Sequence, residues 1–127
     1  MENGKPYAGI GDGTAFTTSN KTFSLPLGQW HHLAAVYDNA ADRLWMYLDG
    51  ELQEEIAITR ELPYKTGVSL SIGADNEGAA NFFTGLIDEA AVFNNALDAG
   101  QIHTLYAKGL NGRDYCAEDL CGNGETD

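Results

Sequence analysis

The sequence feature that most constrains the fold is a pair of apolar segments separated by a short polar break. Residues 30–37 form an apolar run without glycine or proline, and residues 43–48 alternate aliphatic with aromatic side chains. This period-two alternation is typical of a β-strand, and it gives residues 43–48 two apolar faces. A strand that is apolar on both faces is covered on both, so we predict a central strand here. Asp49 and Gly50 then form a favoured hairpin turn.

Other parts of the chain also have β-type patterns. They are residues 6–10, 14–18, 51–58, 68–72 and 82–93. The Gly-Asp-Gly sequence at residues 11–13 predicts a hairpin between the first two. Glu54 and Glu55 direct the third segment toward solvent or a sheet edge. Gly85 marks a bulge or a point of close approach in the last segment.

The pattern changes period close to the C-terminus. Asp98 and Gln101 have the spacing of a capping box, in which each side chain bonds to the other residue's backbone. Apolar residues then recur at helical spacing up to Tyr106, and Lys108 suits the negative end of the helix dipole. Gly109 can end the helix. Several short strands followed by one short helix indicate an all-β sandwich.

Five motifs follow one another at short spacings. They are residues 27–38 (LGQWHHLAAVYD), 44–50 (LWMYLDG), 70–73 (LSIG), 83–89 (FTGLIDE) and 95–106 (NALDAGQIHTLY). In this order they resemble the laminin-G-like group of concanavalin A-like jelly-roll domains. The resemblance implies a jelly-roll β-sandwich with one short C-terminal helix over residues 1–110. It leaves residues 111–127 as a linker or the start of a further module.

The chain departs from the family pattern at its N-terminus. Family members usually begin with further strands before the equivalent of Pro6. We therefore expect that the domain is incomplete there, or that another chain supplies those strands. A sandwich that lacks strands has open sheet edges, which favour self-association or pairing with a partner strand.

The C-terminal tail carries a second resemblance. Residues 121–127 (CGNGETD) are similar to the opening of a Cys-rich repeat that follows binding modules in secreted bacterial proteins. Cys116 and Cys121 form a candidate disulfide. A single pair is weak evidence for an oxidising compartment, and it lacks the four ligands of a zinc site. With the family resemblance, we expect an extracellular or cell-surface location, with the signal peptide outside this chain.

The charge of the chain excludes some partners. The formal net charge is −12, which repels the phosphates of nucleic acids. An anionic membrane surface is disfavoured for the same reason. No stretch reaches the ~18 consecutive apolar residues of a membrane span. We therefore expect neither nucleic-acid binding nor membrane insertion.

No residue set predicts catalysis. His31 and His32 are neighbours in a strand, so their side chains point to opposite faces and cannot bind one metal together. We predict that they pack and form hydrogen bonds within the sandwich. Glycosidases need two carboxylates across the scissile bond. The Glu-x-Asp pattern of glycosidases with this fold occurs here only at residues 125–127, so we predict a domain that is not an enzyme.

Asp75, Asn76 and Glu77 are the strongest candidates for a functional cluster, because calcium binds carboxylate, amide and carbonyl oxygens supplied by flexible loops. Asp12 and Asn81 are candidate additional ligands. The similar loop of calcium-binding relatives such as pentraxins is also acidic. The alternative is that this loop is only a solvated polar segment, without a metal.

Aromatic side chains offer candidate ligand contacts, because they can stack on the apolar faces of sugar rings. We select Tyr64, Phe82 and Phe83, and we expect Trp30 and Trp45 to lie in the core. Asp88 and Glu89 occupy an apolar segment. Alternation directs one of them inward, where it should accept hydrogen bonds from a neighbouring strand or loop.

Together these features predict a non-catalytic binding module of a secreted or surface protein. Its expected partner is a glycan or a glycoprotein surface, with or without calcium. One alternative is a structural or adhesive module that binds another protein through an open sheet edge. A second alternative is an accessory part of a glycoside hydrolase.

Overall fold

The computed structural model describes residues 1, 4–11, 15–59, 71–74 and 81–113. The chain forms two compact units. One consists of Met1–Leu62 with Phe93–Asp127, and the other of Pro63–Val92. Every helix and strand formed by the described residues lies in the first unit.

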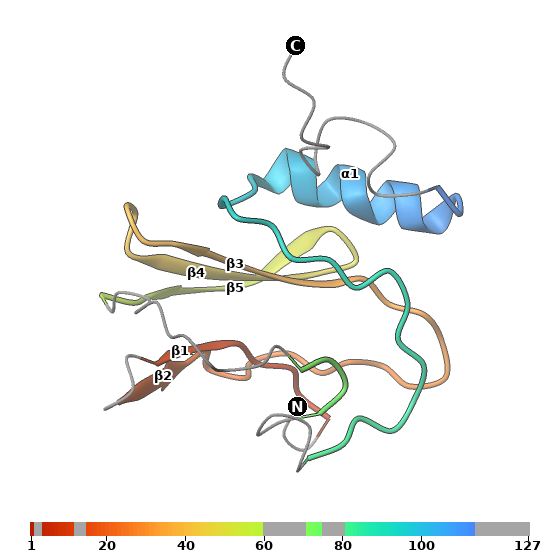
Figure 1. Ribbon diagram of the computed structural model, residues 1–127, viewed down its shortest axis with the longest axis horizontal. Helices are drawn as coiled ribbons and strands as arrows, with labels where there is room; N and C mark the ends of the chain where they lie inside the picture. The colour runs from red at the N-terminus through yellow and green to blue at the C-terminus, as the bar shows by residue number, and fades with distance from the viewer. Residues whose placement is uncertain (2–3, 12–14, 60–70, 75–80, 114–127) are drawn as a thin grey trace. The chain divides into compact units, whose positions relative to one another are not determined.

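A three-stranded antiparallel sheet forms the centre of the first unit (Figure 1). Its strands are β3 (Leu33–Asp38), β4 (Arg43–Leu48) and β5 (Glu51–Ala57), in the order β3-β4-β5. Asp49 and Gly50 join β4 to β5, and both have positive φ, +52° and +79°. Two positive φ values match the tight turn that suits the twist of a hairpin. The predicted central strand and its turn are therefore confirmed.

The strand predicted from residue 30 begins later, at Leu33. The chain bends over residues 27–29, and Gly28 has φ of +85°. This bend keeps Trp30 out of the sheet, and its side chain is 63% exposed. The expectation that Trp30 lies in the core is wrong.

Strand β5 contains a bulge and, next to it, a buried acidic side chain. Met46 pairs with Glu54, whereas Tyr47 pairs with Leu52, so Gln53 is the extra residue. Glu54 is 6% exposed. Its carboxylate accepts hydrogen bonds from the backbone N–H of Asn20 and from the Thr22 hydroxyl at 3.3 Å. These bonds satisfy a charge that would be costly to bury alone.

The prediction that Glu54 points toward solvent or an edge is therefore wrong for its side chain. Glu54 lies on the same face as Ile56 of β5 and Ile58 just after it, so the strand pattern directs it inward although its side chain is charged. Glu55 is exposed as predicted, and it accepts a hydrogen bond from Arg43 Nε at 3.1 Å.

A second, two-stranded sheet confirms the N-terminal hairpin. Strand β1 (Gly9–Gly11) pairs antiparallel with β2 (Phe16–Thr18). Ile10 of β1 packs with Leu44 of β4 and with Ile58 in one buried cluster. The two sheets therefore share a core, as in a β-sandwich.

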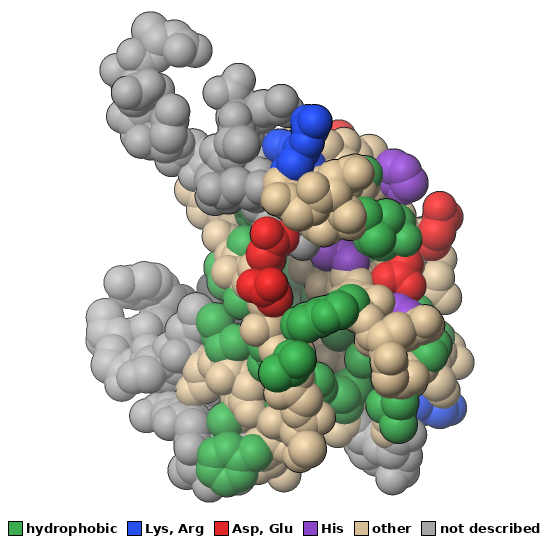
Figure 2. Space-filling view, turned by 90° about the vertical axis from the view of Figure 1, so that its right-hand side faces the viewer, with side chains coloured by type: hydrophobic (Ala, Val, Ile, Leu, Met, Phe, Trp, Pro, Cys, Tyr) green, Lys and Arg blue, Asp and Glu red, His purple; other side chains and the backbone are tan. Residues whose placement is uncertain are grey.

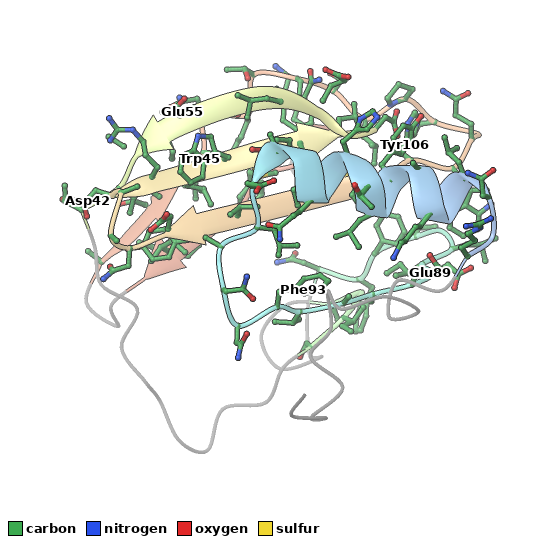
Figure 3. All side chains as sticks on the ribbon, turned by 90° about the horizontal axis from the view of Figure 1, so that it is seen from above. Asp42, Trp45, Glu55, Glu89, Phe93 and Tyr106 are labelled. Atoms are coloured by element: carbon green, nitrogen blue, oxygen red, sulfur yellow. The ribbon has the colours of Figure 1, made fainter. Side chains whose placement is uncertain are left out.

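Helix α1 (Ala99–Leu110) covers the opposite face of the three-stranded sheet (Figures 1 and 3). Ile102 and Leu105 pack with Val36 and Tyr47, and Trp45 is partly buried against this cluster. Strand β4 is thus covered on both faces, and Trp45 packs against the core without being fully buried. Two antiparallel sheets and one short helix among the described residues confirm the predicted all-β sandwich.

The predicted capping box is present at the N-terminus of α1. Asp98 Oδ1 accepts the Gln101 N–H at 2.8 Å, and Gln101 Oε1 accepts the Asp98 N–H at 2.9 Å. The helix does not end at Gly109 as predicted. It continues to Leu110, and Gly112 takes the left-handed conformation with φ of +60°.

The described residues of the second unit, 71–74 and 81–92, contain no strand. The predicted strand 82–93 is therefore wrong. Gly85 has φ of +157° and Glu89 has φ of +48°, and such values interrupt an extended chain. The predicted strand 68–72 lies mostly outside the described residues. No helix in the described ranges is long and apolar enough to cross a membrane.

Candidate functional site

A backbone hydrogen bond in the second unit joins the two described segments that flank the candidate cluster in the sequence. The N–H of Phe83 donates to the carbonyl oxygen of Gly73 at 2.7 Å. Gly73 has φ of +78°, which favours glycine. We call this contact between Gly73 and Phe83 the neck. Asp75, Asn76 and Glu77 lie between the two residues in the sequence, outside the described residues.

Two exposed aromatic rings stand at the C-terminal side of this neck. Phe82 is 69% exposed and Phe83 is 39% exposed. A Cβ atom at Gly85 would lie 2.8 Å from Cε1 of the Phe83 ring, so the ring rests directly against this glycine. Gly85 is thus the point of close approach that the sequence predicted. Tyr64, the third predicted contact, lies outside the described residues.

Asn81 is the one predicted calcium ligand that the described residues include. It is exposed, next to Phe82, and has φ of +50°. Asparagine tolerates this left-handed conformation better than most residues. Asp12 lies outside the described residues. Within the ranges that the structure describes, no three His, Cys, Asp or Glu side chains come together as metal ligands.

Asp88 and Glu89 are both exposed, so the expectation of one inward carboxylate is wrong. Asp88 Oδ1 accepts the N–H of Glu89 at 2.9 Å. The positive φ of Glu89 breaks the alternation on which the expectation depended. The hydrogen bond between the two residues is therefore local and exposed, not a buried polar contact.

The two adjacent histidines are fixed by one carboxylate. Nδ1 of His31 lies 2.8 Å from Asp49 Oδ2, and the backbone N–H of His32 donates to Asp49 Oδ1 at 3.0 Å. Because a carboxylate only accepts, the hydrogen of this contact sits on Nδ1 of His31. The side chain of His31 is only 9% exposed. These contacts confirm the predicted structural role of the pair.

His32 also faces helix α1, which the sequence did not reveal. Its ring centroid lies 6.1 Å from that of Tyr106, and the His103 ring lies 6.2 Å from Tyr106 on the helix. Burial lowers the pKa of His32, and the nearby Asp49 carboxylate partly opposes this effect. His103 and Tyr106 are three residues apart, so the sequence places them on one face of the helix. Nothing in the sequence places that face against His32.

Exposed aromatic side chains also occur in the first unit. Trp30 and Phe16 are each 63% exposed. Figure 2 shows hydrophobic side chains reaching the surface at several places on the face that it draws. The Phe16 ring lies against the glycines of β1. The candidate disulfide, Cys116 and Cys121, lies outside the described residues.

Comparison with known proteins gives a family and one similar solved structure. The crystal structure of an S-layer domain-containing protein from Clostridium thermocellum is 25% identical to this chain. The match covers 72% of this chain and 45% of that one, with a TM-score of 0.47. This chain thus spans less than half the length of that structure. No curated protein matches.

The family model that matches is a laminin-G model described as the concanavalin A-like lectin/glucanases superfamily. It covers residues 1–103, which include both sheets and the first part of helix α1. The suggested boundary after residue 110 remains a prediction. The chain belongs to the laminin-G-like family of the concanavalin A-like lectin/glucanases superfamily.

Proposed function

We propose that this domain is a non-catalytic module that binds carbohydrate through the neck between Gly73 and Phe83. Domains of this family are typically binding modules. The observation that carries the proposal is the exposure of Phe82 and Phe83 beside the hydrogen bond that joins Phe83 to Gly73. The rings are held at a fixed point of the backbone yet remain open to solvent.

Leaving these two apolar rings exposed to water costs free energy. A large apolar side chain stabilises a protein when it is buried, so exposed neighbouring aromatics suit a ligand rather than the fold. The apolar face of a sugar ring can cover an aromatic face. Polar loop residues beside the rings then supply hydrogen bonds for its hydroxyl groups.

We propose calcium as a cofactor of this site. Asp75, Asn76, Glu77 and Asn81 would supply carboxylate and amide oxygens, the donor type that calcium prefers. Asn81 is exposed and lies two residues before Phe83, whose N–H bonds to Gly73. When bound, calcium would offer coordination positions to sugar hydroxyls. Asp12 remains a further candidate ligand.

The test is a glycan-binding screen with matched aromatic variants, in the presence of calcium. Phe82→Ala and Phe83→Ala should each weaken binding at least tenfold. Trp30→Ala is the control, since Trp30 is equally exposed but lies outside this unit. Loss of binding in Trp30→Ala alone would contradict the proposed site. Hydrolysis of the bound glycan by the wild-type domain would contradict the non-catalytic assignment.

A second candidate is protein binding through the edge of β3, the structural or adhesive role. Among the described strands, β3 pairs only with β4. The edge strand β5 carries Glu51, Glu55 and a bulge, devices that discourage further pairing, whereas β3 has no charge before Asp38. Concentration-dependent association that Ala35→Lys abolishes would support this role.

We propose an extracellular or cell-surface location. The support is the family and the resemblance of the tail to secreted Cys-rich repeats. An oxidised Cys116–Cys121 bridge in the secreted protein, detected as a mass increase on reduction and alkylation, would agree with it. Two free thiols in protein recovered from its native source would contradict it.

A further inference from the structure

Helix α1 contacts the β4–β5 turn through Gly50. A Cβ atom at Gly50 would lie 2.9 Å from Tyr106 Cδ1 and 3.0 Å from His103 Nδ1. The backbone of the turn therefore lies directly against two ring side chains of the helix. Tyr106 is on α1 at the end of the sheet where β4 turns into β5 (Figure 3).

His32 completes this contact from the side of the sheet. Its ring is half-buried, and the planes of His32 and Tyr106 are tilted by 43°. Asp49 holds the backbone of His32 through the 3.0 Å bond to its N–H, which fixes the point from which the ring projects. His103 meets the ring of Tyr106 edge-on at 64°. Three rings and one turn thus join the helix to the sheet.

The charged groups around His32, together with its burial, determine whether its ring is neutral or protonated. The turn supplies Asp49, whose carboxylate is shared with His31. The helix carries His103 and Lys108, and His103 contacts Tyr106. The Asp49 carboxylate favours a protonated His32. Burial outweighs Asp49, because the pKa of His32 is below its usual value. The neutral ring is therefore the form that fits the closed contact.

We propose that His32, Tyr106 and the Asp49–Gly50 turn form an acid-sensitive latch, in which protonation of His32 releases the C-terminal half of α1 from the sheet. The strands remain folded when the latch opens. Strand β4 keeps its pairing with β3 and β5 and its apolar contacts on the other face, through Leu44. The capping box at Asp98 keeps the first turn of the helix in place.

Hydrogen exchange of the whole chain tests the latch, with correction for the intrinsic pH dependence of exchange. Between pH 7.5 and pH 5, the amides of residues 103–110 should lose protection, by at most about tenfold per pH unit for one coupled proton. The amides of β4 should keep theirs. A parallel loss in β4 would indicate global acid unfolding and would overturn the proposal.

Two glutamine variants identify the titrating group. His32→Gln removes the proton site and should make helix protection independent of pH. His103→Gln removes a neighbouring ring of the same contact, so it can lower helix protection at every pH, but it should leave the loss of protection between pH 7.5 and pH 5 as in the wild type. A pH response that survives in His32→Gln, or that disappears in His103→Gln, would overturn the assignment.

If His32→Gln does not fold, NMR titration of the histidine rings of the wild-type protein identifies the titrating group instead. The midpoint for His32 should coincide with the opening of the helix. A helix that opens at a different pH from the His32 midpoint, or that becomes more protected in acid, would contradict the latch.

Discussion

The buried side chain of Glu54 in β5 accepts a hydrogen bond from the hydroxyl of Thr22, 32 residues earlier in the chain. The carboxylate also accepts from the backbone of Asn20. A buried acidic side chain therefore ties the segment after β2 to the edge of the main sheet.

Glu54→Ala should lower the free energy of unfolding by about 2 kcal/mol, since hydrogen bonds to a charged group are each worth about 1.5–3 kcal/mol. Glu55→Ala is the matched control. Its exposed contact with Arg43 should contribute less than about 1 kcal/mol. Denaturant unfolding measures both variants. Equal effects of the two substitutions would contradict the anchoring role of Glu54.

Gly50→Ala should destabilise the domain more than Gly112→Ala. Both glycines have positive φ, so each substitution costs roughly 1–2 kcal/mol for the backbone alone. Only the Cβ at position 50 would also meet Tyr106 and His103, whereas nothing lies within 4 Å of position 112. The difference should be about 1 kcal/mol or more. Similar melting temperatures for the two variants would show that α1 does not press on the turn.

The stability of the domain should fall as the pH rises above about 10, partly because of Tyr47. Its burial raises its pKa, and the carboxylates of Asp98 and Glu55 add to the effect. The unfolded chain then loses the phenolic proton at a lower pH than the folded chain does, so alkali favours unfolding. Tyr47→Phe should weaken this alkaline loss, measured by denaturant unfolding from pH 9 to pH 11. An unchanged pH dependence in Tyr47→Phe would contradict it.

Calcium should raise the melting temperature of the wild-type domain. A ligand at 100 times its dissociation constant stabilises by about 2.7 kcal/mol. Asp75→Ala should remove this effect, whereas Asp88→Ala, an exposed carboxylate with a local partner, should not. A melting temperature that is the same with calcium and with a chelator would contradict calcium binding by Asp75 and its neighbours.

Local patterns in the sequence predicted the best-defined elements. Alternation in β4 and the Asp49–Gly50 turn depend on neighbouring residues only. The same holds for the capping box of Asp98 and Gln101. In these cases the physical cause lies within a few residues, so the sequence contains the needed information.

Features that depend on distant parts of the chain were predicted poorly. The buried Glu54 accepts a hydrogen bond from Thr22, 32 residues earlier in the chain. A bend at Gly28 keeps Trp30 out of the strand that begins at Leu33 and leaves it exposed. The positive φ of Glu89 cancels an alternation that the residue types alone suggest. The neck between Gly73 and Phe83 likewise follows from a contact between separate segments.

The most direct test of the proposed binding site is an NMR titration of the isotope-labelled domain with the glycan that binds best in the screen. The backbone signals of residues 71–74 and 81–83 should shift first and most, and calcium should strengthen the effect. The signals of β3–β5 should change little. Shifts confined to the sheet or to the surface around Trp30, with the neck unaffected, would contradict the account.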